Sequence, residues 1–128
     1  MPDYNTTVRT DRMTVVRDAS NGGKLSLYSG TKPAGGGAIT TLLAEFNLST
    51  PSGTVTSGVL TFTDPSNTTV VADGQCTWAR ITASGGGWVA DFTASQVGGT
   101  GEIRLTEDNL TTGMTLDITS LTITEGNP

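Results

Sequence analysis

The chain has 128 residues, a formal net charge of −5 and a hydrophobic content of 34%. A chain of this length is expected to form a single domain with its own hydrophobic core. The acidic balance argues against direct nucleic-acid binding, because neutralising phosphates requires a basic face. The sequence also lacks the run of about 18 apolar residues that a membrane-spanning helix needs. Its start has no signal-peptide pattern, so we expect a protein made in the cytoplasm.

Threonine is the most frequent residue, with 25 copies beside 10 serines and 17 glycines, and histidine is absent. Many threonines alternate with apolar residues, and β-branched side chains fit the pleated, half-buried surface of a strand. The composition therefore predicts an all-β protein whose short strands are joined by glycine-rich turns. Without histidine, the chain lacks the usual general base near neutral pH.

Residues 1–23 are predicted to form an N-terminal arm that contains a helix over residues 6–20. Asn5 or Thr6 can cap the start of this helix, and a glycine pair marks its end. One narrow face of this helix is apolar and consists of Val8, Val15 and Ala19, with Arg12 on the same stripe. This face is expected to pack on the sandwich or on a neighbouring subunit. An extended arm is the alternative, since valine and threonine are mediocre helix formers.

Charge is distributed unevenly along the chain. Residues 1–32 carry a net charge of +2, whereas the remaining 96 residues carry −7. A basic arm on an acidic body suits docking between copies or onto an acidic partner, although a solvated helix face explains these charges equally well. Because the arginine fork pairs well with carboxylates, Arg9, Arg12 and Arg17 are the predicted partner-binding residues.

From residue 24 onward the pattern is that of strands, and residues 24–128 are predicted to form the β-domain. The first expected strands are 24–29, 41–48 and 58–63, with a loop over 30–37, a turn at 51–53 and a break at 64–67. In each of these strands, alternation places the apolar residues on one face. They are Leu25 and Leu27 in the first strand, Leu42, Ala44, Phe46 and Leu48 in the second, and Leu60 and Phe62 in the third.

The expected strands of the second half are 70–72, 75–82, 88–93, 102–105 and 114–124. Cys76 shares a strand face with Trp78, and Trp88, Ala90 and Phe92 alternate with Val89, Asp91 and Thr93. Cys76 and Trp88 are therefore both predicted to be core residues. In the last segment the apolar positions change parity, which predicts a bulge or a switch of sheet near Thr119 and Ser120.

About eight strands spaced about ten residues apart are typical of an antiparallel sandwich or barrel. We therefore predict an antiparallel, jelly-roll-like β-sandwich of about eight strands, preceded by the N-terminal arm or short helix.

The chain shows no convincing pattern for catalysis or metal binding. A serine or cysteine nucleophile has no histidine to activate it, and Lys24 and Lys32 resemble solvated side chains rather than members of a serine–lysine pair. Acids such as Asp91 and Glu102 could form a glycosidase pair, but aromatic residues for sugar stacking are few. Residues 107–109 lack the spacing of a calcium loop. We predict a non-enzymatic protein with no catalytic residues, cofactor or metal.

Three segments carry a family resemblance: PDYNTTVRTDRMTVVRDA (residues 2–19), LSLYSGTKPAGGGAITTLLAEFNLS (25–49) and LTITEGNP (121–128). They resemble small virion proteins encoded in the structural modules of tailed bacteriophages and prophages. The resemblance implies a capsid decoration, or cement, protein on the exterior of the virion. Such a protein is made in the host cytoplasm, binds the major capsid protein and is typically a homotrimer.

Two other functions remain open. One is a tail component, such as a tube, collar or tip subunit. The other is a glycan-binding module displayed on the virion, in which Trp88 and Asp91 would form a sugar-stacking spot.

Overall fold

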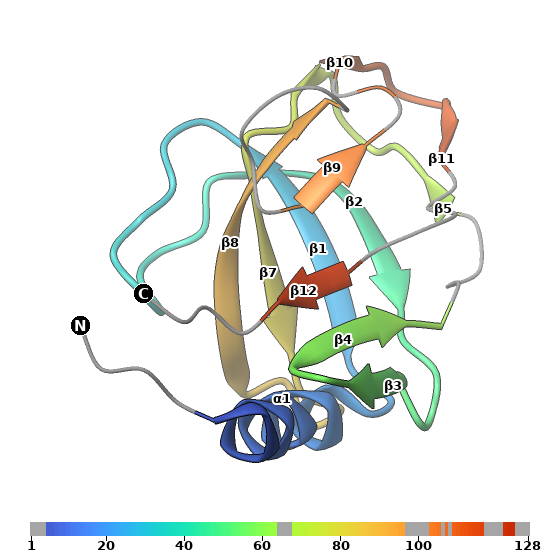
Figure 1. Ribbon diagram of the computed structural model, residues 1–128. Helices are drawn as coiled ribbons and strands as arrows, with labels where there is room; N and C mark the ends of the chain where they lie inside the picture. The colour runs from blue at the N-terminus through green and yellow to red at the C-terminus, as the bar shows by residue number, and fades with distance from the viewer. Residues whose placement is uncertain are drawn as a thin grey trace.

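The computed structural model describes residues 5–63, 68–96, 103–105, 107, 109–116 and 122–124. Over these residues the protein is mostly β, as predicted, with one helix and sheets that are antiparallel apart from one parallel pair (Figure 1). The helix α1 spans Thr6–Ser20. The strands are β1 (Lys24–Ser29), β2 (Thr41–Asn47), β3 (Gly53–Thr56), β4 (Val59–Phe62), β5 (Thr68–Thr69), β6 (Gly74–Gln75), β7 (Trp78–Thr82), β8 (Trp88–Gln96), β9 (Ile103–Leu105), β10 (Asn109–Leu110), β11 (Thr115–Leu116) and β12 (Thr122–Thr124).

The larger sheets contain five and three strands. The five-stranded sheet has the order β2-β1-β7-β8-β9, in which β9 runs parallel to β8, and the three-stranded sheet has the order β12-β4-β3. Two further pairs, β10-β6 and β11-β5, have two residues in each strand. These short pairs explain why the described part of the chain contains twelve strands rather than about eight.

Helix α1 has the predicted bounds, and its start is capped by Asn5, whose Oδ1 accepts a hydrogen bond of 2.8 Å from the Val8 amide. The predicted apolar face does not pack against the protein's own chain. Val15 is 69% exposed and Val8 39% exposed, whereas Met13 and Ser20 are buried. The long side chain of Met13 reaches the core, and the Ser20 hydroxyl donates to the Val16 carbonyl at 2.7 Å. The apolar stripe of the sequence therefore faces away from the core.

Hydrogen bonds fix both ends of α1 to the segment that forms β3 and β4. The Gly58 amide, in the β3–β4 turn, donates to Thr10 Oγ1 at 3.0 Å. At the other end the Ser52 hydroxyl donates to the Arg17 carbonyl at 2.9 Å, and the Ser52 amide donates to Asn21 Oδ1 at 2.7 Å. The helix is thus an integral part of the folded body rather than a free arm (Figure 1).

A β-bulge changes the faces predicted for the second strand. Leu27 pairs with Ala44, but the next residue, Tyr28, pairs with Leu42, so Leu43 is the extra residue. Leu43 is fully buried and Leu42 only half-buried, contrary to the simple alternation. An extra residue on one strand reverses parity locally, which a count of alternating positions does not reveal.

Other predicted strands are displaced. No strand forms over residues 70–72; β5 ends at Thr69, although Val70 is still buried. The expected strand 75–82 is interrupted after Gln75, and β3 was not expected. The predicted break at 64–67 and the change of parity at 119–120 lie outside the described residues.

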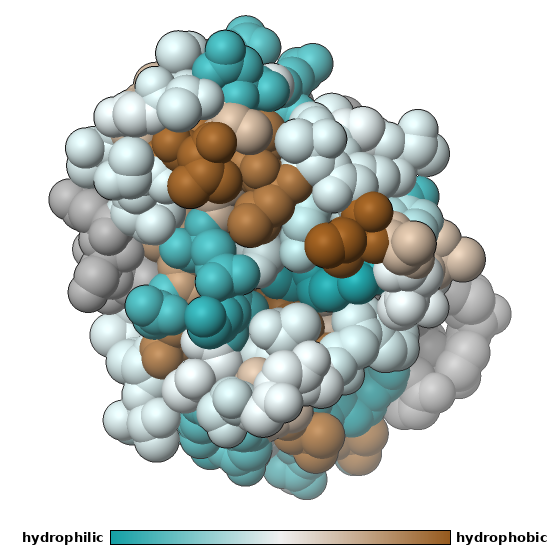
Figure 2. Space-filling model, turned by 180° about the vertical axis from the view of Figure 1, so that it is seen from behind, coloured by the Kyte–Doolittle hydropathy of each residue, from teal (hydrophilic) through white to brown (hydrophobic). Residues whose placement is uncertain are grey.

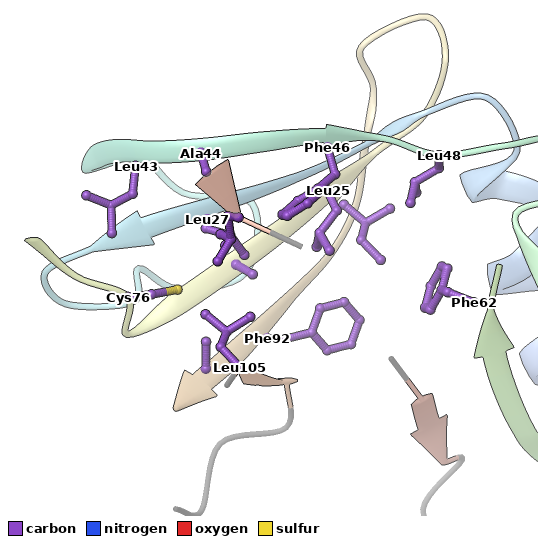
Figure 3. Close-up of a cluster of buried hydrophobic side chains, with 14 of the residues drawn as sticks. Leu25, Leu27, Leu43, Ala44, Phe46, Leu48, Phe62, Cys76, Phe92 and Leu105 are labelled. Carbon is purple, nitrogen blue, oxygen red and sulfur yellow. The ribbon is translucent and has the colours of Figure 1, made fainter. Parts of the chain in front are cut away.

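The core lies between the five-stranded sheet and the opposing segments (Figure 3). Its side chains come from both sheets, from helix α1 and from the short strands, and Figure 3 labels Leu25, Leu27, Leu43, Ala44, Phe46, Leu48, Phe62, Cys76, Phe92 and Leu105. Cys76 is 1% exposed, so its predicted role as a small core residue is confirmed. Trp88, which was also predicted to be a core residue, is 52% exposed, and that prediction was wrong.

Candidate functional site

The three arginines predicted to bind a partner occupy different environments on α1. Arg9 is half-buried against the β3–β4 turn, where a Cβ added to Gly58 would lie 3.1 Å from the Arg9 Cβ. Arg17 forms an ion pair of 3.0 Å with the neighbouring Asp18. Arg12 is exposed, on the side of the outward apolar stripe. Arg9 and Arg17 thus contact their own chain, and Arg12 is the one that accompanies the stripe.

A second candidate surface is the outer face of the five-stranded sheet. Figure 2 shows the molecule from the side opposite to that of Figure 1, and on this side hydrophilic and hydrophobic residues lie next to one another. Strand register places the side chains of the outer face in three rows across β2, β1, β7 and β8. The aromatic row is Leu42, Tyr28, Trp78 and Thr93; the ionic row is Glu45, Ser26, Arg80 and Asp91; the Trp88 row is Asn47, Lys24, Thr82 and Trp88.

The ionic row has the Arg80–Asp91 pair at one end. Arg80 Nε donates to Asp91 Oδ1 at 2.7 Å, and Arg80 Nη2 donates to Asp91 Oδ2 at 3.1 Å. The pair is nearly buried, with side-chain exposures of 10% for Arg80 and 2% for Asp91. At the other end of the row, Glu45 accepts hydrogen bonds of 3.1 Å from both Ser26 and Lys24.

A second β-bulge lies next to this pair. Thr82 pairs with Trp88, but Ile81 pairs with Ala90, so Val89 is the extra residue. In a strand that alternated without the bulge, Trp88 and Asp91 would lie on opposite faces. The bulge therefore puts Trp88 and Asp91 on the same face, where the Trp88 indole N–H donates to Asp91 Oδ1 at 3.1 Å.

Asp91 holds the β1–β2 loop onto the sheet as well. Its Oδ2 accepts a hydrogen bond of 3.1 Å from the Gly36 amide, and Arg80 Nη2 donates to the Gly37 carbonyl at 2.8 Å. The Asp91 carboxylate thus accepts from four donors, which matches the lone-pair sites of its two oxygens. Asp91 is a structural clamp and has no acceptor left for a sugar hydroxyl.

Charges and hydrogen bonds fix the ionisation of the pair. Burial would by itself raise the pKa of the Asp91 carboxyl, but hydrogen bonds from Arg80, Gly36 and Trp88 outweigh it, so that the pKa is below its usual value. The hydrogen bond to Asp91 raises the pKa of the Arg80 guanidinium, against the opposing effect of burial. Both groups are charged at neutral pH, and their charges cancel locally.

The aromatic row lies directly beside this clamp. Tyr28 and Trp78 stack with ring centroids 4.4 Å apart, and the Arg80 guanidinium lies 5.2 Å from the centroid of Trp78. The Trp78 indole N–H donates to Thr40 Oγ1 at 2.9 Å, which anchors the far end of the same loop.

Glycines let the loop lie on Trp88. A Cβ added to Gly35 would stand 3.4 Å from the Trp88 ring, and one added to Gly36 would stand 3.3 Å from it. Gly36 also has a φ of +76°, which favours glycine. One part of the indole therefore rests on loop backbone, and the remainder is exposed to solvent.

Chemical groups for catalysis or metal binding do not converge in the described part of the chain. Among those residues no three of Asp, Glu, Cys or His are grouped as a metal site would need. Lys24 is paired with Glu45 rather than with a serine, and the Glu107 carboxylate accepts a hydrogen bond from the Asn109 amide. No helix in the described residues is long and apolar enough to span a membrane.

The Arg80–Asp91 clamp was not predicted as a site. Alternation puts Arg80 on the face of Trp78 and Asp91 on the face opposite to Phe92. That the two residues are partners depends on the register between β7 and β8, which alternation does not contain.

Comparisons of the chain with protein-family models, with curated proteins and with solved structures gave no match.

Proposed function

We propose that the protein is a non-enzymatic capsid decoration protein that binds the outside of a bacteriophage head and stabilises the shell. In this proposal it acts as a homotrimer, contacts the major capsid protein and resides on the exterior of the virion. The proposal also includes the finer fold description, in which the two larger sheets form a jelly-roll-like sandwich.

The observation that supports the proposal most is the outward stripe of α1. Val8, Val15 and Ala19 are exposed, at helical spacing, with Arg12 beside them. Exposed apolar side chains on one face of a helix offer a surface whose burial by a partner is favourable. The family resemblance of residues 2–19, which include this stripe, supports the same role.

The stripe is also rigid, which favours attachment. Hydrogen bonds from Gly58 and Ser52 hold α1 to the body, and Met13 anchors it in the core. A surface ordered before binding loses less conformational entropy when it docks. If three such helices belong to one trimer, modest contacts from each combine into tight attachment through avidity.

The arrangement of α1 determines how attachment is tested. Deleting residues 1–20 would remove Met13 from the core, so a truncated protein could fail to bind because it is misfolded. Val15→Asp is a cleaner change, because Val15 is 69% exposed and contacts little of its own chain. Val71→Asp is the matched control, since Val71 is an exposed valine (61%) outside the helix.

The experiment is co-sedimentation of the purified protein with empty shells that lack it. We expect Val15→Asp to weaken attachment at least about 10-fold, Arg12→Glu to weaken it less, and Val71→Asp to bind as the unaltered protein does. Equal binding of all four proteins would contradict the role of α1.

Gold-labelled protein on intact virions separates the head from the tail. Label on the head supports decoration. Label confined to the tail would replace the proposal with that of a tube, collar or tip subunit.

A further inference from the structure

The Trp88 row presents an aromatic ring followed by hydrogen-bonding groups on an open sheet face. Trp88 and Asn47 lie at the two ends of the row, with Thr82 and Lys24 between them. Trp88, Lys24 and Asn47 are exposed and Thr82 is half-buried. Neighbouring strands lie about 4.8 Å apart, so these side chains form an evenly spaced line across four strands.

The ring of Trp88 is held in a fixed orientation. Its indole N–H is used by Asp91 at 3.1 Å, and part of the ring rests on Gly35 and Gly36. What remains exposed is therefore carbon surface, which stacks on other carbon surfaces and offers no hydrogen bond. Because ring and loop are both clamped, little conformational entropy would be lost when a ligand covers them.

The groups beyond the ring favour a hydroxyl-rich ligand. The Thr82 hydroxyl, the Lys24 ammonium and the Asn47 amide together offer donors and acceptors. Lysine is depleted at the centre of protein–protein interfaces, which makes a second protein a poorer fit for this row. Lys24 also lies 3.1 Å from the Glu45 carboxylate, and Arg80 is neutralised by Asp91, so the surface carries little net charge.

We propose that the Trp88 row is a binding site for a neutral oligosaccharide, which stacks the C–H face of one sugar on Trp88 and extends its hydroxyls along Thr82, Lys24 and Asn47. The inference goes beyond the decoration role and does not depend on it. It also replaces the Trp88–Asp91 spot expected from the sequence, since Asp91 orients Trp88 and does not contact the sugar.

The test is an NMR titration of the full chain with cellohexaose, maltohexaose and chitohexaose in turn. The chain has two tryptophans, and buried Trp78 serves as an internal reference for exposed Trp88. We expect at least one oligosaccharide to shift the Trp88 indole signal and the Lys24 and Thr82 amides in a saturable way, while the Trp78 indole signal stays unchanged.

Variants make the assignment specific. Trp88→Ala should weaken binding at least about 10-fold, whereas Trp88→Phe, which keeps an aromatic face, should weaken it less. Lys24→Met should weaken binding without changing the Trp88 environment, and Val71→Ala is the control that should bind normally.

Three results would overturn the proposal. One is the absence of a saturable shift with all three oligosaccharides at millimolar concentration. Another is the same affinity in Trp88→Ala as in the unaltered protein. The third is a shift of the Trp88 signal that follows protein concentration alone, without oligosaccharide, because the row would then be a contact between copies.

Discussion

The two faces of the five-stranded sheet are covered in different ways. The inner face carries apolar side chains such as Leu27, Phe46 and Ile81, all fully buried against the opposing segments. The outer face is partly buried as well, but by hydrogen bonds, an ion pair and a stack of aromatic rings beneath the glycine-rich loop. Three residues of the outer face are therefore buried, although they alternate along their strands with the core residues of the inner face: Ser26, Tyr28 and Trp78.

The two faces show how a chain with few apolar residues covers both sides of its central strands. Only 34% of the residues are hydrophobic, and the core uses most of the large ones. Polar groups can be buried on the other side because each finds a partner, with Arg80 and Asp91 satisfying each other and the loop. The inner face provides burial energy, and the outer face fixes the positions of the loop and Trp88.

A substitution on the inner face should lower the stability most. Phe46→Ala should lower the free energy of unfolding by about 4 kcal/mol, because it removes a fully buried aromatic ring and leaves a cavity. Urea unfolding followed by circular dichroism measures this loss. Val71→Ala, at an exposed position, should change the free energy by less than about 0.5 kcal/mol.

On the outer face, Arg80→Met should cost about 3 kcal/mol, because it leaves the nearly buried Asp91 carboxylate without its main partner. The double variant Arg80→Met/Asp91→Leu should regain part of the loss, since no uncompensated charge remains. The same urea experiment measures both. The loss of stability of Asp91→Leu alone completes the comparison. If the loss of the double variant equalled the sum of the losses of the two single variants, the two residues would not act as a pair.

The contact between the β1–β2 loop and the Trp88 ring predicts a smaller loss of stability. Gly36→Ala combines a positive φ with a Cβ 3.3 Å from the Trp88 ring, so we expect a cost of about 2 kcal/mol. Gly86→Ala also has a positive φ, but no atom would lie within 4 Å of its Cβ, and it should cost about 1 kcal/mol. Equal losses of thermal stability would mean that the Trp88 contact contributes nothing.

The last prediction concerns how the stabilising contribution of the Asp91 carboxylate changes with pH. Since the pKa of Asp91 is lowered on folding, its stabilising contribution is present above the unfolded value of about 4 and is lost as the pH falls through the folded value. Asp91→Asn should therefore be less stable than the unaltered protein at pH 7, and the difference should shrink towards pH 2. Melting temperatures measured across this range test the sign. A difference that grows on acidification would show that the carboxylate is not stabilising.

Local signals in the sequence were sufficient for α1 and for several strands. Asn5 and the glycine pair after Ser20 gave the helix its bounds, and alternation located β1 and β4. The packing face of α1 was missed because Met13, Val16 and Ser20 do not form an apolar pattern of their own; the hairpin they contact decides that they are buried.

The outer face depends on register, which local patterns do not contain. The bulges at Leu43 and Val89 each shift parity by one residue, so that Leu42 lies beside Tyr28 and Trp88 lies beside Thr82 on the outer face. Because such pairings depend on long-range strand contacts, the clamp and the exposure of Trp88 could not be predicted from alternation.

Cryo-electron microscopy of empty shells decorated with the purified protein tests the central proposal most directly. We predict density on the outside of the head in which α1 presents Val8, Val15 and Ala19 to the shell or to a neighbouring subunit. Shells that remain bare, or bound copies whose α1 stripe faces only solvent, would contradict it.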